Sequence, residues 1–508
     1  RATAATRVDE AGLVNYAEVL GSEKIINGDF ATDSDWDKES PWTIENGVAN
    51  GNGAVGSSEE LKQSQAFTLG TTYKVVYTIL NHVSGSIRFQ IVGGGTSVGG
   101  TFHAENGTYT EYVTTIANNI LFRFKAASSF NGSIDNVSVK EVTRDNVPRI
   151  DYTGGGCPHI LAEPQRTNLV TYSQDFTSYN FLNGSSGTSN YSISPDGTEN
   201  GTRLQLAAIN LARMEESFSG SSIANKYHTV SCFVKSNGGN TNFRLKCTHS
   251  SVLDYYSVDL TATSEWQRFT FTQLFGSGSS NSINVGIANS TSNNAADLSI
   301  YGLQLEQDSS FATSYIPTSG SSVTRNRDTF TRDGISSLIN DSEGTFFLDL
   351  AYLSVNTNYT AQSSVSLSDG TTNNRVILYT GATSSANRYT ILIKSGGNTI
   401  ISKTLTVTDI TLFNKIAITW KTNEYKIFWN GNFHHLDTSQ TAVPSGLNRL
   451  AFDRGDSALN IFNGKVKQLQ VYKTALTDEQ LLQLTGESGT DFYESYAEMA
   501  EALTYTIQ

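Results

Sequence analysis

An alternation of apolar and polar residues runs through most of the chain, and it constrains the fold more than any other feature. In the stretch IRFQI, the apolar residues Ile87, Phe89 and Ile91 fall on one face and the polar residues between them on the other. This period of two is typical of a half-buried β-strand. YKVVYTIL and EYVTTI behave in the same way. The sequence therefore predicts an all-β fold of tandem jelly-roll or β-sandwich domains, with short helices only at the C-terminal end.

The chain has 508 residues, and domains of roughly 100–200 residues predict about three to four of them. A connector around Val147–Leu169 contains three prolines and the Gly154–Gly156 run. Proline restricts φ and glycine permits conformations closed to other residues, which predicts a connector of defined geometry. The predicted division is a β-hairpin and connector segment (1–21), an inserted β-sandwich (22–142), a connector (143–167), a second β-sandwich (168–306), a connector (307–328), a third sandwich (329–485) and a helical tail (486–508).

The first two sandwich blocks carry similar markers in the same order. Each block opens with a short polar motif that ends in phenylalanine, continues with an aromatic strand and closes with an alternating strand. The paired markers are Asn27–Phe30 with Ser173–Phe176, Gly107–Tyr112 with Ser264–Phe269, and Ser133–Val139 with Leu298–Leu305. The order predicts two copies of one β-sandwich module.

Local signals predict the smaller elements. Strand-like residues on both sides of Asp9–Gly12 predict a hairpin, which the VPRIDY segment of the first connector is expected to complete. Trp429–Asn432 ends a strand in a tight-turn sequence. Thr477–Gln480 forms a capping box before a short helix. The tail has apolar residues at helical spacing, which predicts an amphipathic helix that docks on a neighbour or on its own domain: Phe492, Tyr496, Met499 and Leu503.

Composition excludes several functional classes. The net charge of -13 argues against a protein that binds the phosphate backbone of nucleic acids, because such proteins need a basic surface. No run approaches the roughly 18 apolar residues of a membrane span, and no signal peptide is visible. The chain begins with Arg1 rather than Met, which predicts a fragment or a processed form. The low charged fraction of 16% and the 43 glycines are typical of an extracellular-type β protein.

Three cysteines are too few for a disulfide framework. Cys232 and Cys247 lie in two strand-like runs separated by a glycine-rich turn. If those runs form a hairpin, the two thiols come close enough for a disulfide, but two buried free thiols are the preferred interpretation.

Catalytic and metal-binding motifs are weak. The nearest acidic strand residues, Asp349 and Asp453, are isolated, whereas glycoside hydrolysis needs paired carboxylates. Cys157 and His159 lack a second cluster of metal ligands, so packing of the connector is the preferred interpretation. His434 and His435 are expected on a solvated edge. The tripeptide that begins at Arg454 is expected to form a polar turn. No cofactor is expected, although the loops near Asp29 and Asp135 offer oxygen ligands for a structural calcium ion.

Carbohydrate binding needs exposed aromatic faces with polar groups beside them. Trp36 and Trp42 lie in the polar run DSDWDKESPW, so they are the main stacking candidates, with a core or lid position as the alternative. Trp429 abuts a turn and is the third candidate. Trp266 and Trp420 lie in strand patterns and are expected in the core.

The connector segments carry a resemblance to a known family. ATRVDEAGLV, NVPRIDYTGGGCPHILAEPQRTNLVTYSQDF and YIPTSGSSVTRNRD resemble the signature of bacteriophage virion proteins with carbohydrate-binding-module-like domains, such as tail or head fibres. The block 329–485, from EGTFFLDL to NGKVKQLQVYKTALTDEQLLQLT, resembles a concanavalin A-like (laminin G-type) sandwich. The end, FYESYAEMAEALTYTIQ, is similar to the C-terminus of such phage proteins. In that family the first two segments follow each other almost directly, so residues 22–142 resemble an inserted module.

The resemblance implies a non-enzymatic virion protein, located on the particle surface, that binds host surface glycans and contacts other virion proteins. It also implies a homotrimer, without nucleic acid and without membrane insertion. Two alternatives remain open. One is a polysaccharide depolymerase that uses the concanavalin-like domain, and the other is a purely structural virion protein that binds no sugar.

Overall fold

The structure is a computed structural model that describes residues 1–219, 223–249, 255–277, 282–354, 363–380, 387–456 and 459–486. These residues form β-strands with one α-helix and one 3-10 turn among them, so the predicted all-β class is confirmed. The chain divides into two compact units. Residues 18–147 form one unit, and residues 1–17 pack with residues 148–508 in the other.

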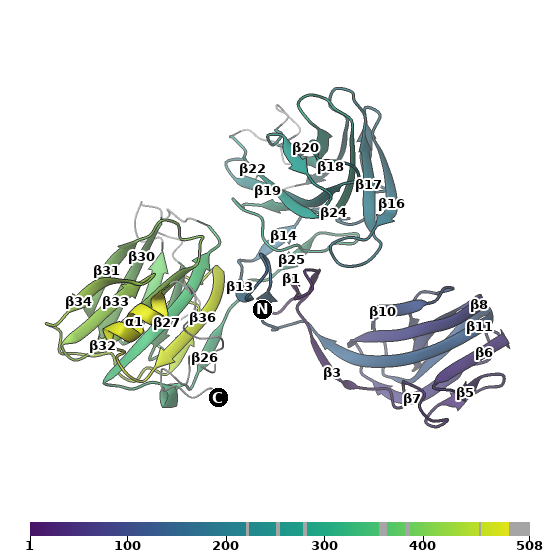
Figure 1. Cartoon of the computed structure of the whole chain (residues 1–508), viewed down its shortest axis with the longest axis horizontal. Helices are drawn as coiled ribbons and strands as arrows, with labels where there is room; N and C mark the ends of the chain where they lie inside the picture. The colour runs from purple at the N-terminus through teal and green to yellow at the C-terminus, as the bar shows by residue number, and fades with distance from the viewer. Residues whose placement is uncertain are drawn as a thin grey trace. The chain divides into compact units, whose positions relative to one another are not determined.

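The unit 18–147 is a nine-stranded arrangement organised around two long antiparallel strands, β8 and β11 (Figure 1). Both strands are kinked by register shifts, so each contributes to both halves of the sandwich. The strands are β3 (Val19–Glu23), β4 (Asp37–Lys38), β5 (Thr43–Glu45), β6 (Val48–Val55), β7 (Leu61–Phe67), β8 (Thr72–Gly93), β9 (Thr96–Gly99), β10 (Gly107–Thr114) and β11 (Asn119–Thr143).

The second sandwich has a seven-stranded and a five-stranded sheet. Its core contains the alternating apolar residues of the inner strands, such as Leu204, Leu245 and Ile287. Its strands are β14 (Arg166–Asn168), β15 (Asn180–Leu182), β16 (Ser186–Ser192), β17 (Gly201–Leu206), β18 (Arg213–Ser219), β19 (Tyr227–Ser236), β20 (Thr241–His249), β21 (Leu260–Ala262), β22 (Gln267–Leu274), β23 (Ser282–Asn289), β24 (Ala296–Gln307) and β25 (Val323–Arg325).

The two sandwiches share one strand plan, which supports the predicted repeat. β10 pairs with the first half of β8 as β22 pairs with β19. The second half of β11 pairs with β6 and β3 as β24 pairs with β17 and β14. The first half of β11 pairs with β7 as β23 pairs with β18. The long strands β8 and β11 of the first module therefore correspond to the broken pairs β19–β20 and β23–β24 of the second.

The third sandwich packs the seven-stranded sheet β12-β13-β36-β27-β32-β33-β34 against the six-stranded sheet β26-β35-β28-β29-β30-β31. Its core lies between them and contains Phe346, Leu348 and Leu350 of β27. The strands are β26 (Thr331–Asp333), β27 (Glu343–Tyr352), β28 (Ser363–Ser368), β29 (Arg375–Thr380), β30 (Arg388–Ser395), β31 (Asn398–Thr406), β32 (Asn414–Lys421), β33 (Glu424–Trp429), β34 (Asn432–Asp437), β35 (Arg449–Ala451) and β36 (Gly464–Tyr472), with the 3-10 turn η1 (Ser336–Leu338) after β26.

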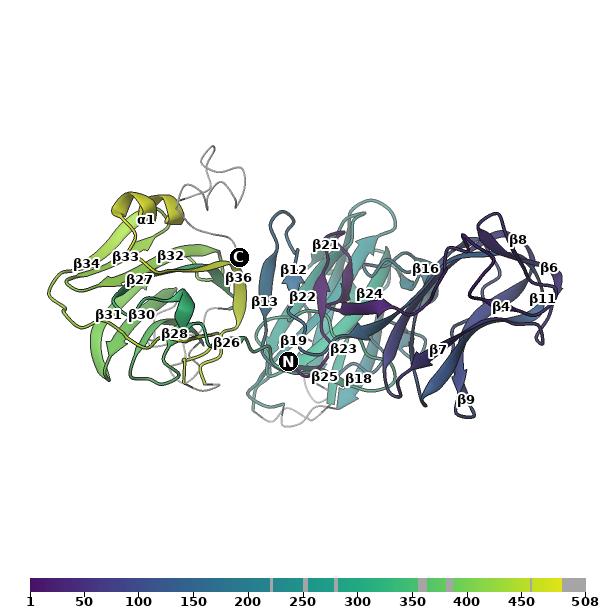
Figure 2. The ribbon, with the colours of Figure 1, turned by 90° about the horizontal axis from the view of Figure 1, so that it is seen from below.

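The helix α1 (Asp478–Thr485) begins with the predicted capping box, in which the Thr477 hydroxyl accepts from the Gln480 N–H. It packs on β32 and β33, on the face of the sheet turned away from the core (Figure 2). The predicted tight turn is also confirmed, because Asn430 and Gly431 both have positive φ, at 44° and 73°. The tail residues Phe492, Tyr496, Met499 and Leu503 lie outside the described residues. No helix in the described ranges is long and apolar enough to cross a bilayer.

The predicted N-terminal hairpin is confirmed, with β1 (Thr6–Val8) paired to β2 (Val14–Tyr16). The expectation that VPRIDY completes this element is only partly correct. The Tyr152 N–H donates to the Val8 carbonyl over 3.0 Å, but β12 (Ile150–Asp151) pairs with β13 (His159–Ala162). β13 in turn pairs with β36, so the connector hairpin extends a sheet of the third sandwich. Its glycine run has φ angles of 94°, 72° and 72°, a region that favours glycine.

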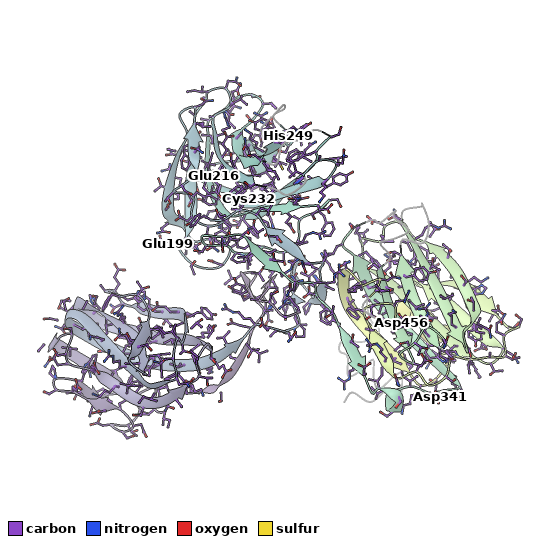
Figure 3. The ribbon with its side chains drawn as sticks, turned by 180° about the vertical axis from the view of Figure 1, so that it is seen from behind. Glu199, Glu216, Cys232, His249, Asp341 and Asp456 are labelled. Atoms are coloured by element: carbon purple, nitrogen blue, oxygen red, sulfur yellow. The ribbon has the colours of Figure 1, made fainter. Side chains whose placement is uncertain are left out.

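The preferred interpretation of two buried free thiols is confirmed, and the hairpin that a disulfide would have required does not form. Cys232 and Cys247 are buried and free, and Cys232 lies inside the second sandwich (Figure 3). However, β19 pairs with β22 and β24, whereas β20 pairs with β21 and β23. The two consecutive strands lie in different sheets, because the glycine-rich turn carries the chain across the sandwich.

Candidate functional site

Two of the three tryptophans predicted to stack on sugars are buried. Trp36 and Trp42 are 6% and 4% exposed, and both belong to the core of the unit 18–147. Their indole N–H groups donate to the carbonyls of Asn27 and Glu59. The polar sequence around them is misleading because hydrogen bonds from the rings compensate for burial. Neither ring offers a face for stacking in this structure.

Trp429 is half-buried against the core of the third sandwich, and its indole N–H donates to Asn414 Oδ1 over 3.1 Å. Trp420 is fully buried, as expected. Trp266 differs from the expectation, because it is only half-buried and its ring lies 5.1 Å from Lys235 Nζ. Its indole N–H donates to the Ile193 carbonyl over 2.9 Å, close to the exposed Tyr191. Exposed aromatic rings are also present on the other sandwiches, at Tyr112 and Phe433.

A polar cavity of about 600 Å³ lies in the third sandwich, beside the connector hairpin. Side chains alternate along β27, so Asp349 points away from the core that contains Leu348 and Leu350. Phe347, on the same face, is covered by Leu481 and Leu484 of α1. Asp349 lies beyond the helix, where the face opens into the cavity.

The cavity contains polar groups from three strands and from the connector. Asp349 comes from β27, Lys415 from β32, Lys467 from β36, and Cys157 and His159 from the connector. The register shifts by one residue opposite Asp349, which leaves Lys467 as the extra residue of a β-bulge. A bulge re-aims the side chain that it contains. The Lys467 ammonium lies 4.3 Å from the centre of the Phe413 ring, and Lys415 Nζ donates to the Gly486 carbonyl over 2.7 Å.

Burial controls the ionisation of two of these groups. Asp349 is 5% exposed, and burial raises its pKa although Lys415 and Lys467 act in the opposite direction. Burial lowers the pKa of His159 to about 4, which Asp151 opposes and Lys465 and Lys467 reinforce. His159 is therefore neutral at pH 7. Asp349 Oδ1 and His159 Nε2 have no hydrogen-bond partner among the described residues.

The two acidic residues considered for catalysis do not form a pair. Asp349 is on the seven-stranded sheet, whereas Asp453 follows β35 of the six-stranded sheet. Asp453 accepts the Gly455 N–H over 2.7 Å. Within the described part of the chain, no group of three or more His, Cys, Asp or Glu residues is placed to hold a metal ion. In the two loops considered for a calcium ion, the carboxylates accept backbone hydrogen bonds. Asp135 accepts from the Asn136 N–H, and Asp29 Oδ1 accepts from the Ala31 N–H.

The remaining motif residues behave as polar surface. His434 is exposed on β34, the edge strand of its sheet, and His435 is half-buried there. The Arg454 guanidinium pairs with Asp456 over 2.6 Å. Both observations agree with the expected solvated edge and polar turn.

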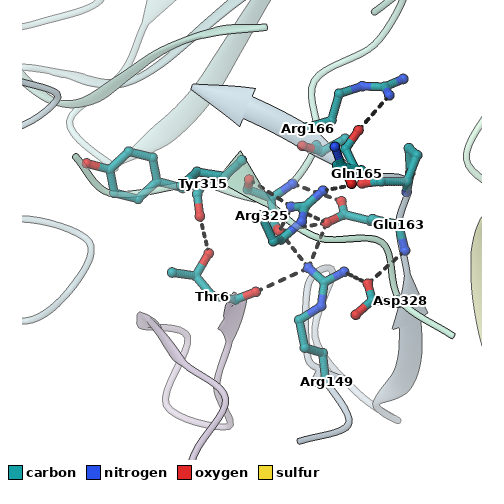
Figure 4. A network of polar contacts seen from close by, with 12 residues as sticks. Thr6, Arg149, Glu163, Gln165, Arg166, Tyr315, Arg325 and Asp328 are labelled. Carbon is teal, nitrogen blue, oxygen red and sulfur yellow. Dashed lines mark hydrogen bonds and ion pairs between the residues drawn. The ribbon is translucent and has the colours of Figure 1, made fainter. Parts of the chain in front are cut away.

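The connectors meet in a buried ion cluster made of Arg1, Arg149, Glu163, Arg325 and Asp328. Figure 4 shows Arg149, Glu163, Arg325 and Asp328 of this cluster. The Glu163 carboxylate forms ion pairs with Arg149 over 2.6 Å and with Arg325 over 2.7 Å. The Asp328 carboxylate forms an ion pair with Arg149 and a second one with Arg1, over 2.9 Å. All five charged side chains are at most 4% exposed. The cluster joins the N-terminal segment and both connectors within one compact unit, so it fixes the base of the hairpin beside the cavity.

Sequence reasoning missed most of the cavity. Asp349 was singled out from its strand pattern, and Cys157 and His159 from the connector. The sequence around Lys415 and Lys467 does not indicate a binding role, because isolated lysines on strands are usually surface residues. The bulge at Lys467 depends on pairing between β27 and β36, which are more than a hundred positions apart in the chain.

Comparison with known proteins identifies part of the chain. Residues 350–482 match the concanavalin A-like lectin/glucanases superfamily, which confirms the expected fold of the third sandwich. No curated protein sequence matches the chain.

Several solved structures are similar to this chain at low sequence identity. The tandem CBM22 domains from Paenibacillus barcinonensis are 9% identical, cover 57% of this chain and 98% of their own, and give a TM-score of 0.23. The Ruminococcus gnavus sialidase CBM40 is 21% identical, with coverages of 31% and 93% and a TM-score of 0.26. Domains LG4-5 of the mouse laminin alpha1 chain are 10% identical, with coverages of 58% and 92% and a TM-score of 0.21.

Proposed function

We propose that this protein is a non-enzymatic structural protein of a bacteriophage particle that displays glycan-binding β-sandwiches for attachment to the host surface. The observation that carries the glycan-binding part is the cavity in the concanavalin A-like sandwich. It combines a hydrophobic wall with a few converging polar groups, and its size lies within the roughly 300–1,000 Å³ of small-molecule sites.

The charges of the cavity favour binding over cleavage. Glycoside hydrolysis needs two carboxyl groups on opposite sides of the scissile bond. Asp349 is the only carboxylate among the described residues that line the cavity. Its neighbours there include lysines, an asparagine, a neutral histidine and apolar side chains, which can orient a sugar but supply no second carboxyl group.

The virion role is supported by the connector segments that resemble those of phage fibre proteins. These segments contain the buried ion cluster, and a rigid base of this kind suits a protein that holds several modules on a particle. We propose a homotrimer, assembled through sandwich faces, that contacts other virion proteins at the particle surface.

The experiment is a glycan array with the full-length protein, together with mass spectrometry of purified particles and light scattering of the protein at high concentration. We expect glycan binding, presence in the particle and a trimer. A monomer that is absent from every particle would overturn the virion role. A blank array with a positive particle result would favour the purely structural alternative. Release of reducing ends from host polysaccharide would instead support a depolymerase.

A further inference from the structure

The charge of the residues that line the cavity is opposite in sign to the net charge of the chain. The protein has a net charge of -13, yet the charged residues that line the cavity are Lys415, Lys467 and Asp349. Lys465 adds a positive potential at the connector side, where it acts on His159. A strongly acidic protein that gathers lysines around one cavity has a local potential that attracts anions.

The cavity also contains a buried acceptor without a donor. Asp349 Oδ1 has no hydrogen-bond partner in the described part of the chain, although the residue is only 5% exposed. An unpaired buried carboxylate oxygen is costly, and hydroxyl groups are suitable donors to it. A ligand that satisfies the site therefore needs at least one hydroxyl donor and an anionic group.

We infer that this cavity binds a carboxylate-bearing sugar residue of an acidic glycan, such as a uronic acid. The sugar carboxylate pairs with Lys467, and a sugar hydroxyl donates to Asp349 Oδ1. This inference rests on the proposed glycan-binding function and assigns the ligand class and the two anchoring residues.

The geometry around Lys467 supports its role. Lys415 Nζ donates to the Gly486 carbonyl at the end of α1, which uses one of the three N–H donors of its ammonium. Lys467 is exposed, and the bulge directs it over the face of Phe413. The aromatic face holds the ammonium by a cation–π interaction at the lining of the cavity. Pro158 and Phe413 also line the cavity and can contact the apolar face of a sugar ring.

The test is calorimetric titration of the full-length protein with uronic-acid trisaccharides and with the same trisaccharides after carboxyl reduction. The variants are Lys467→Ala and, as a matched control, Lys421→Ala, an exposed lysine on β32 outside the cavity. We expect the acidic sugar to bind, with an affinity that falls about tenfold or more in Lys467→Ala, since a charge-assisted contact is lost. Lys421→Ala should bind like the wild type, and added salt should weaken wild-type binding.

The other outcomes separate this inference from the proposed function. Acidic-sugar binding that is unchanged in Lys467→Ala places the glycan elsewhere and overturns the site, while the glycan-binding function stands. Equal affinity for the reduced sugars overturns the acidic class. Failure to bind any glycan on the array overturns both. Lys467→Arg should restore binding, because the charge returns without any change in the fold.

Discussion

The Arg149 guanidinium donates to the Glu163 carboxylate over 2.6 Å, with 0% and 4% of the two side chains exposed. Arg325 reaches the same carboxylate from the second connector, and Ser314 donates to it through both its backbone N–H and its hydroxyl. One acidic residue therefore joins residues from the first connector to those from the second. The fold of the connectors depends on this residue.

Replacing Glu163 by alanine should destabilise the unit that contains the connectors by about 3–5 kcal/mol, because the buried Arg325 guanidinium loses its ion pair and Arg149 keeps only its pair with Asp328. Urea denaturation followed by tryptophan fluorescence measures the loss. Asp333→Ala, which removes an ion pair whose acidic side chain is 66% exposed, is the control and should cost at most about 1 kcal/mol. Equal effects of the two substitutions would show that the cluster carries no special stability.

The pH dependence of stability should follow Glu163. Burial raises its pKa, but Arg325 and Arg149 outweigh burial, and the net result is a pKa well below the ordinary value of 4.5. The unfolded chain binds a proton first as the pH falls, so the stabilisation is complete above about pH 4.5 and is lost below it. The stability difference between the wild type and Glu163→Gln should therefore be large at neutral pH and shrink in acid. A constant difference across the acid range would contradict this assignment.

Asp349→Asn should make the protein more stable at neutral pH, by roughly 1–3 kcal/mol, because it removes a buried charge that lacks a donor. The pKa of Asp349 is raised, so the folded state takes up a proton before the unfolded state as the pH falls. The free-energy cost of the buried Asp349 charge is present above the pKa that this residue has in the folded state. It disappears below the ordinary value of 3.8. Thermal denaturation at neutral and acid pH should show a gain that shrinks in acid, whereas Asp333→Asn should show little gain.

The three thiols should differ in reactivity. Burial raises the pKa of Cys232 and of Cys247 to about 12, and the thiolate is the reactive form. Cys157 is exposed. Alkylation of the native protein followed by mass spectrometry should modify Cys157 alone, and alkylation in denaturant should modify all three. Rapid modification of Cys247 in the native protein would contradict the packing described for β20.

Trp36→Ala tests whether this residue acts in the core or in sugar binding. The change should destabilise the unit 18–147 by about 3–5 kcal/mol, because it leaves a large cavity in a packed core. Scanning calorimetry measures the shift of that unit. Ile26→Ala, at a position that is 58% exposed, is the control and should change the stability by about 0.5 kcal/mol or less. Weakened glycan binding without loss of stability would restore a stacking role for Trp36.

Much of the architecture could be predicted from local patterns. The period-two alternation around Ile87 and Ile416 identifies strands, because one face of each strand packs in the core. The hairpin at Asp9–Gly12, the turn at Asn430–Gly431 and the capping box at Thr477 depend on a few neighbouring residues. These elements were predicted correctly because their physical causes lie within a short stretch of sequence.

Predictions of which side chains are buried, and of which strands pair with each other, were less reliable. Trp36 and Trp42 lie in a polar stretch, yet the sandwich buries their rings and satisfies their N–H groups. The strands that carry Cys232 and Cys247 are adjacent in sequence, yet the turn between them crosses to the other sheet. Local sequence does not record which strand pairs with which, because pairing is decided by contacts between distant segments.

By itself, the sequence determined an all-β chain of repeated sandwiches joined by proline- and glycine-rich connectors, since strand periodicity and turn chemistry are local. Only the tertiary structure brought Arg149, Glu163 and Arg325 together, and only the pairing of β27 with β36 placed Lys467 beside Asp349. Charge neutralisation in a buried cluster and the field in a cavity both depend on distances across the fold. Those distances follow from long-range pairing, which the order of residues does not display.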